Sequence, residues 1–305
     1  MEAASQEYDK AIALLREFGY GFNASGQLRQ IDATSGEPGE KPFEFKVSED
    51  FDQNQRHYEK LGDIIQEIVY GLLEKNGLKR LYIPFRTPAE QASFVFTQPE
   101  EVKKSKKLLV LINGSGVVRA GQWARSLIIN HSLDHGSQLP YIQRAQELGY
   151  DIVVTNTNDN ERYINGKFSR IEGVATALDH ANYAWEHIVM ASDPESVAIV
   201  AHSYGGYLTI QLSKMHKEFF KKKVFAIALT DSSHGSLPDD SKEYLRKVAC
   251  NWASSEKPLD AKLPTSDRDV PRISAGHPKH EWSSYAAMES VMKYFEQKYE
   301  QFTRE

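Results

Sequence analysis

A serine stands between an apolar run and a predicted helix in the segment "VAIVAHSYGGYLTI", residues 197–210. A nucleophile elbow places a serine on such a strand-to-helix turn, and it needs small residues two positions before and after the serine. Ala201 and Gly205 occupy those positions around Ser203, and Gly206 leaves further room. The segment predicts that Ser203 is a nucleophile for acyl transfer; the alternative is a tight turn that happens to carry a serine.

Acyl transfer also needs N–H groups directed at the oxyanion that forms in the transition state. The backbone N–H of Tyr204 is one predicted donor, because it directly follows the nucleophile. The segment "LVLINGSGVV" at 109–118 provides a glycine-rich loop earlier in the chain. We expect Gly114 and Ser115 to complete the oxyanion hole, with Asn113 and Gly116 lining the pocket. The alternative is that these glycines only permit a sharp turn.

A base and its orienting acid should follow the serine in the order acid, then histidine. Asp231 ends the apolar run "VFAIALTD" and is the predicted acid, with a turn or N-cap aspartate as the alternative. Asp260 and Asp267 are weaker substitutes. Two histidines follow the last predicted strand, and we predict His280 as the base because of its longer reach over the loop. His277 is the alternative base.

Two further histidines flank the predicted site. His202 precedes Ser203 and is expected to line the pocket, and His234 follows Asp231 closely. The histidines, the acidic residues and the one cysteine show no metal-binding spacing, and "INGSG" lacks the Gly-Lys-Ser/Thr ending of a phosphate loop. We therefore expect neither a metal nor a cofactor.

These residues follow apolar runs that alternate with helical patterns. Continuous apolar strands separated by helices predict a mostly parallel sheet with helices on both faces, and in such sheets the site lies at the carboxyl ends of the strands. Strands are expected at 107–113, 150–156, 196–201, 224–231 and 271–276, with two edge strands at 78–84 and 92–98, and helices at 138–149, 173–190, 207–220, 239–252 and 281–299.

The N-terminal part has a different pattern. Residues 5–18 predict an amphipathic helix, 20–31 a hairpin, and 51–77 a long helix with apolar residues at helical spacing. We expect an extension over 1–76 that packs on a core domain over 77–305 and forms one structural unit with it.

Composition narrows the classes of function. The 305 residues include 37 basic and 42 acidic side chains, a net charge of −5, which argues against a nucleic-acid clamp over the whole surface. The basic run at 103–107 is read as a solvated segment before a buried strand. One cysteine excludes an intramolecular disulfide, and no run approaches the ~18 apolar residues of a membrane span. The N-terminus lacks a signal-peptide pattern. No membrane association is expected.

Several long segments carry a family resemblance. "VLINGSGVVRAGQWARSLIIN", "VAHSYGG", "ALTDSSH", "CNWASSEKPLD" and "RISAGHPKHE" resemble the Arb family of Argonaute-binding domain proteins, which includes vertebrate cotranscriptional regulators. The likeness covers roughly residues 18 to 298. It implies an α/β-hydrolase fold, with Ser203 as the suspected nucleophile and His280 at the family's histidine position.

The resemblance also implies partners and a location. It implies Argonaute, chromatin and splicing factors as partners, with roles in alternative splicing or RNA silencing in the nucleus and cytoplasm. A hydrolase of small ester-type substrates without a regulatory role is the alternative. Vertebrate members carry a Lys/Arg-rich insertion where this chain has only "TNDNERYINGKFSRIEG", which weakens the expectation of nuclear import.

The segment "VRAGQWARSLI" offers a candidate interaction surface. Arg119, Trp123 and Arg125 are residue types that anchor interfaces, and we expect them to be exposed if the chain works as a binding module. The alternative is a loop packed on the domain.

Overall fold

An eight-stranded sheet forms the centre of the molecule in the computed structural model, which describes residues 2–98, 105–164 and 166–304. The strand order is β12-β11-β10-β9-β5-β6-β4-β3, parallel from β12 to β6 and antiparallel for the last two strands. The strands are β3 (Lys79–Ile83), β4 (Ser93–Thr97), β5 (Lys107–Ile112), β6 (Asp151–Val154), β9 (Ser196–His202), β10 (Val224–Thr230), β11 (Ala249–Ala253) and β12 (Arg272–Ser274).

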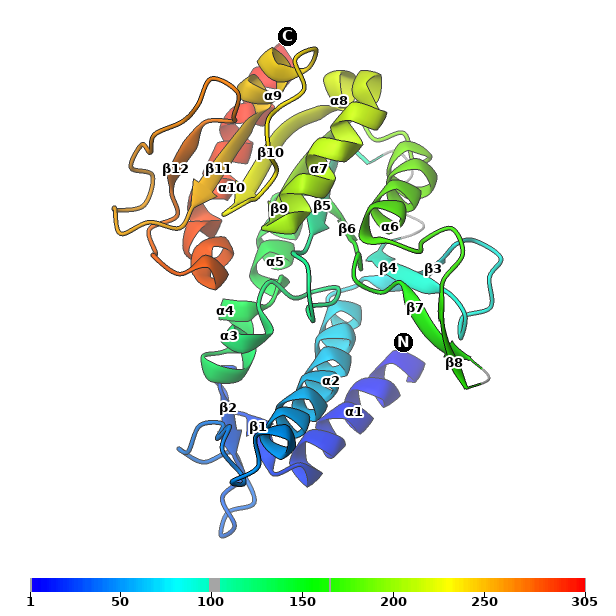
Figure 1. Cartoon of the computed structure of the whole chain (residues 1–305), viewed down its shortest axis with the longest axis vertical. Coiled ribbons are helices and arrows are strands. Elements are labelled where there is room, and N and C mark those ends of the chain that lie inside the picture. The colour runs from blue at the N-terminus through cyan, green and yellow to red at the C-terminus, as the bar shows by residue number, and fades with distance from the viewer. Residues whose placement is uncertain (1, 99–104, 165, 305) are drawn as a thin grey trace.

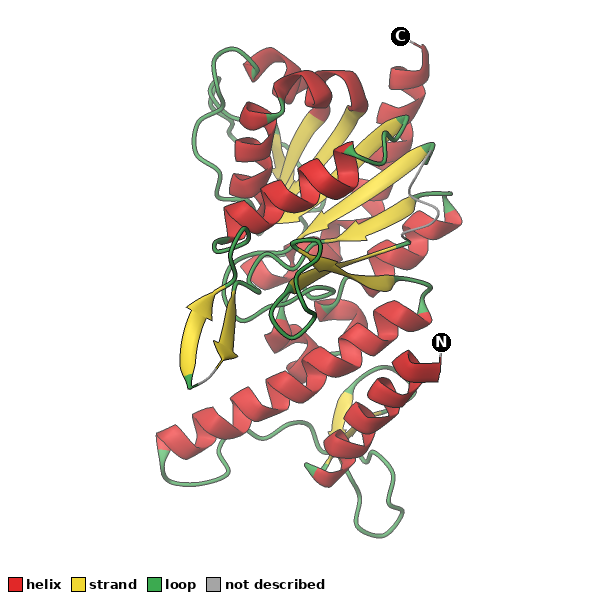
Figure 2. Ribbon diagram, turned by 90° about the vertical axis from the view of Figure 1, so that its right-hand side faces the viewer, coloured by secondary structure: helices red, strands yellow, loops and turns green. Residues whose placement is uncertain are grey.

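Helices cover both faces of this sheet (Figure 2). Along β5, Leu108, Val110 and Ile112 belong to one apolar core, whereas Leu109 and Leu111 belong to the other. This alternation is the two-residue period of a strand buried on both faces. The first face packs against α6 (Ala177–Ala184), the π-helical turn η1 (Trp185–Met190), α7 (Tyr204–Met215), α8 (Lys217–Lys223) and α9 (Lys242–Val248), and the second against α2 (Phe51–Lys75), α5 (Leu139–Glu147) and α10 (Ser283–Arg304).

The N-terminal elements form a separate apolar cluster beside the sheet. Helix α1 (Glu2–Glu17) lies along α2, and the hairpin of β1 (Tyr20–Phe22) and β2 (Leu28–Gln30) packs at their end (Figure 1). Asp50 caps α2 by accepting hydrogen bonds from the N–H groups of residues 52 and 53. Their cluster includes Ile128 and Ile129 of α3 (Arg125–Asn130), which joins the extension to the core.

Trp123 and Arg125 are buried, so the expectation that they form an exposed interaction surface is wrong. Trp123 is only 2% exposed and Arg125 only 8%, and Arg119 is half-buried. The Arg125 guanidinium lies 5.0 Å from the centre of the Tyr58 ring and fills the space left by Gly62 on α2. These side chains therefore hold the N-terminal helices to the core.

Three local expectations are corrected, and one pair of strands was not expected. β4 is an inner strand, because it pairs with both β3 and β6, and its five residues are all buried. The helix expected over 239–252 ends at Val248, and Ala249–Ala253 is the strand β11. The helix expected over 173–190 begins at Ala177 and changes to a π-helical turn at Trp185. The segment after β6 forms an unpredicted pair of strands, β7 (Glu161–Ile164) and β8 (Lys167–Arg170).

The remaining short elements are α4 (Leu133–Gly136) and the 3-10 turn η2 (His280–Trp282), which leads into α10. Lys103 and Lys104 of the basic run lie outside the described residues. Within the described ranges, no helix combines the length and apolar character needed to cross a membrane.

Candidate active site

Ser203 occupies a sharp turn between β9 and α7, at the carboxyl end of the parallel strands. Its backbone angles are φ 53° and ψ −119°, a conformation that non-glycine residues rarely adopt. Such strain costs on the order of 1–3 kcal/mol and persists only where the surrounding structure imposes it. The turn is held by hydrogen bonds from Ser203 N–H to Thr230 O (3.1 Å) and from Ser233 N–H to Ser203 O (3.3 Å). This is the geometry of a nucleophile elbow.

The two glycines after Ser203 are required by close approaches of neighbouring atoms. A Cβ on Gly205 would lie 2.6 Å from the carbonyl oxygen of Ile112 and 2.8 Å from that of Asn113. A Cβ on Gly206 would lie 1.7 Å from Ser232 Oγ. The first contact is with backbone, which cannot turn away as a side chain can. The small residues read from the sequence therefore let α7 approach the end of β5.

Asp231 and His280 form a hydrogen-bonded pair. His280 Nδ1 lies 2.6 Å from Asp231 Oδ2, and the carboxylate also accepts from the N–H (2.9 Å) and hydroxyl (2.8 Å) of Ser254. Asp231 follows β10 with φ 47°, Ser254 follows β11, and His280 begins η2 after β12. The three neighbouring strands β10, β11 and β12 thus bring these groups together at their carboxyl ends.

The pair shifts the pKa of both partners. Burial alone would raise the pKa of the Asp231 carboxyl, but the hydrogen bonds from His280 and Ser254 outweigh burial and lower that pKa to about 2. The hydrogen bond to Asp231 raises the pKa of the His280 imidazole, and partial burial opposes this only in part. Asp231 is therefore ionised at neutral pH.

His277 lies apart from this pair. Its ring stacks on Trp282 with 4.7 Å between ring centres, and its Nδ1 accepts a hydrogen bond from Lys279 N–H (3.1 Å). The geometry therefore favours His280 over His277 as the base. Among the described residues, no direct hydrogen bond joins Ser203 Oγ to the His280 ring; in ligand-free sites such bonds are often long and tighten when substrate binds.

The glycine-rich loop after β5 lies against Ser203. A Cβ on Gly114 would be 3.2 Å from Ser203 Cβ, so the loop contacts the serine directly. Within the described chain, the N–H groups of Gly114 and Ser115 donate no hydrogen bond, and Tyr204 N–H begins a helix, where N–H groups have no partner inside the helix. Gly116 takes φ 99°, which allows the loop to turn away. Gly114 therefore lies beside Ser203, and the role of these N–H groups as oxyanion donors stays a prediction.

Two asparagines after β6 fix this loop. Asn158 Nδ2 donates to the carbonyl oxygens of Gly114 (2.8 Å) and Val118 (2.9 Å), and Asn156 Oδ1 accepts from Ala120 N–H (2.9 Å). Asn113 is fully buried and donates to Gly114 O (2.9 Å). Asn158 was not singled out from the sequence, although the asparagine-rich run "TNTNDN" was its signal.

His202 packs behind the base. Its ring centre lies 4.6 Å from that of His280, and its Nδ1 is 2.9 Å from Thr230 O. Burial, with a smaller effect from the neighbouring His280, lowers the pKa of His202 to about 4. A neutral ring at this place adds no positive charge beside His280.

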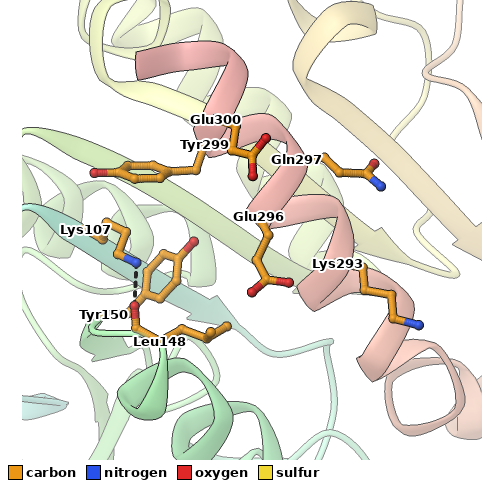
Figure 3. Close-up of a pocket in the computed structure, with 8 residues that line it drawn as sticks. All are labelled: Lys107, Leu148, Tyr150, Lys293, Glu296, Gln297, Tyr299 and Glu300. Atoms are coloured by element: carbon orange, nitrogen blue, oxygen red, sulfur yellow. Dashed lines mark hydrogen bonds between the residues drawn. The ribbon is translucent and has the colours of Figure 1, made fainter. Parts of the chain in front are cut away.

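A spacious pocket, about 470 Å³, lies away from these residues, where β5 begins. Figure 3 shows Lys107 directed at the carbonyl oxygen of Leu148, with Tyr150 and Tyr299 beside it and the acidic residues of α10 at its rim. The Lys107 amine lies 4.8 and 5.1 Å from the centres of the two tyrosine rings. This pocket holds no nucleophile–base pair, so the candidate site remains the one at Ser203. Across the described ranges, no group of three or more His, Cys, Asp or Glu side chains is arranged to hold a metal ion.

The sheet, its two helical layers and the elbow at the end of β9 define an α/β-hydrolase-fold protein. The family model of the Arb2 domain matches residues 13–259. The cotranscriptional regulator ARB2A of Homo sapiens and its homolog from Gallus gallus are each 38% identical to this chain, over 92% of it and 79% of their own length. The chain belongs to the Arb2 domain family.

One solved structure, that of the histone deacetylase Clr3, resembles this chain with a TM-score of 0.52. The match covers 78% of this chain and 39% of that one at 12% sequence identity. At that identity the likeness shows a shared fold and carries no statement about activity.

Proposed function

We propose that this chain is a gene-regulatory protein of the Arb2 family that retains a serine hydrolase site for a small ester-type substrate. The observation that carries the hydrolase part is the hydrogen bond of 2.6 Å between His280 and Asp231, two residues that follow the elbow serine in the order a triad requires. The regulatory part rests on relatives that are named cotranscriptional regulators.

Each proposed catalytic residue has one role. Ser203 Oγ attacks the substrate carbonyl while His280 Nε2 accepts the hydroxyl proton, and Asp231 stabilises the imidazolium that forms. The N–H groups of Tyr204 and Gly114, or Ser115, bind the oxyanion. His280 then gives the proton to the leaving oxygen, and a water molecule deprotonated by His280 hydrolyses the acyl–serine ester.

A fluorophosphonate probe tests the nucleophile, because it phosphonylates activated serines. We expect the wild-type protein to be labelled and Ser203→Ala to be unlabelled. Ser126→Ala, which removes an exposed hydroxyl outside the proposed site, is the matched control and should leave a labelled protein. Equal labelling of wild type and Ser203→Ala would sink the hydrolase proposal.

The regulatory role predicts nuclear protein partners. By the family resemblance, an Argonaute protein and chromatin or splicing factors are the proposed partners. The protein is proposed to be present in the cytoplasm as well as in the nucleus. Affinity capture from nuclear extract with wild type and with Ser203→Ala tests this. Recovery of an Argonaute or a splicing factor by both proteins would support binding that is independent of catalysis; recovery of neither class of factor would contradict the regulatory proposal.

A further inference from the structure

A second polar site lies beside the loop that follows Asp231, next to β11 and β12, the two strands labelled in Figure 1. It is a pocket of about 380 Å³, which we call the Arg272 pocket. Its polar lining includes Ser232, Ser233, His234, Asn251, Arg268 and Arg272. Arg272 and Asn251 are partners in the register of β12 with β11, so the strand pairing itself brings them together.

Arg272 is the unusual member of this lining. Its Nε is shut off from solvent and has no hydrogen-bond partner, and the residue is only partly exposed. Within the described residues, its guanidinium forms no ion pair and donates no hydrogen bond. Its backbone N–H donates to the Thr265 hydroxyl, and its carbonyl oxygen accepts from Leu263 N–H. The terminal nitrogens of Arg272 are not shut off from solvent, so an anion in the pocket would supply the acceptor that this guanidinium lacks.

The one carboxylate in the pocket is already occupied. Asp269 Oδ1 accepts hydrogen bonds from His234 Nε2 (2.8 Å) and from Val270 N–H (2.7 Å). Because a carboxylate only accepts, His234 Nε2 is the donor in its contact with Asp269, and His234 Nδ1 lies 2.8 Å from the Ser232 hydroxyl. The pocket therefore has two arginines against one carboxylate, which leaves it with a net positive charge.

We propose that the Arg272 pocket binds a phosphate group, either as inorganic phosphate or as a small phosphomonoester. The donors come from separate segments: Arg272 from β12, Arg268 from the preceding loop, and the Ser233 and Ser236 hydroxyls from the loop after β10. The oxygens of a phosphate are arranged tetrahedrally and accept from donors on all sides, whereas the acceptor sites of a carboxylate lie in one plane. Arginine suits phosphate because its planar fork can make two parallel hydrogen bonds.

This site is distinct from the proposed acyl-transfer site. Ser203 does not line the pocket, and the two are connected through backbone, where Ser233 N–H donates to Ser203 O. Phosphate binding therefore does not depend on whether Ser203 is a nucleophile.

Isothermal titration calorimetry on the full chain, at constant ionic strength in chloride, tests the proposal. Inorganic phosphate and glycerol phosphate are titrated separately, and the tighter of the two identifies the source of the phosphate group. We expect saturable binding to the wild-type protein and at least about tenfold weaker binding to Arg272→Gln. Acetate should bind far more weakly than phosphate.

Arg29→Gln is the matched control, since Arg29 is likewise half-buried on a short strand but lies in the N-terminal extension. It should bind phosphate as the wild type does. Ser233→Ala is a milder second variant that should also weaken binding if Arg272→Gln fails to fold. No saturable heat with either phosphate ligand, or equal affinities for wild type, Arg272→Gln and Ser233→Ala, would overturn the proposal.

Discussion

His280 and Asp231 are 49 residues apart in the chain, yet their Nδ1 and Oδ2 atoms are 2.6 Å apart. Because the ionised carboxylate can only accept, this contact assigns the proton of neutral His280 to Nδ1 and leaves Nε2 unprotonated. An unprotonated Nε2 is the nitrogen that a general base must present. The bond thus determines both the orientation and the tautomer of the ring.

Replacing the acid should slow acylation strongly. We expect Asp231→Asn to lower the rate of fluorophosphonate labelling by about 10³–10⁴-fold, because an amide would favour the wrong histidine tautomer and would not stabilise the imidazolium. Asp260→Asn is the control, since Asp260 hydrogen-bonds to Ser290 and Trp252 instead. If Asp260→Asn were the slower variant, the acid would be misassigned.

The rate of labelling should rise with pH through the pKa of His280, because only the neutral ring accepts a proton. Asp231 raises that pKa, so the midpoint should lie above the ordinary histidine value of about 6.5. In Asp231→Asn the raising interaction is gone while burial still lowers the pKa, so the midpoint should move to lower pH. The pH–rate profile measures this, and His277→Ala should leave the midpoint in place. A profile that is flat from pH 5 to 9 would contradict a histidine base.

Gly205→Ala should destabilise the protein, although replacing glycine by alanine in a helix usually stabilises it. Alanine in place of glycine ordinarily stabilises a helix by up to about 1 kcal/mol. Here the new Cβ would meet the backbone oxygens of Ile112 and Asn113, so we expect a loss of about 1–3 kcal/mol in the free energy of unfolding. Urea denaturation checks the sign, with Lys214→Ala at the exposed end of the same helix as control. A stabilised Gly205→Ala protein would show that the strand and helix are farther apart.

Removing the buried Arg125 side chain should loosen the N-terminal extension. We expect Arg125→Ala to lower the free energy of unfolding by about 2 kcal/mol, since it loses its contact with the Tyr58 ring and leaves a gap beside Gly62. Ser126→Ala, an exposed neighbour, should change it by less than about 0.5 kcal/mol. Equal stabilities of the two variants in urea would rule out this anchoring role.

The three proposed catalytic residues could be predicted because sites in parallel sheets lie at the carboxyl ends of the strands. Ser203, Asp231 and His280 each follow an apolar run, and parallel strands bring their carboxyl ends together, so their proximity could be inferred without knowing the loops. Ser254 was missed because the run before it was read as the end of a helix. Its strand, "ACNWA", is short, and one side of a helix can be equally apolar.

The burial of Trp123 and Arg125 could not be read from residue type. Both side chains suit interfaces, and here the interface is internal, between the core and the N-terminal helices. The sequence does not say on which side of the loop those helices lie. The inner position of β4 was missed for a similar reason, since flanking prolines are compatible with edge strands and with the turns that border an inner one.

At Ser203, the residue type that would best suit the backbone conformation is not the one that the proposed reaction needs. A glycine would adopt φ 53° at little cost and make the protein harder to unfold, but it would remove the hydroxyl. Any attempt to make this protein more heat-resistant by relieving strained residues would include this site and erase the group on which the proposed hydrolase activity depends.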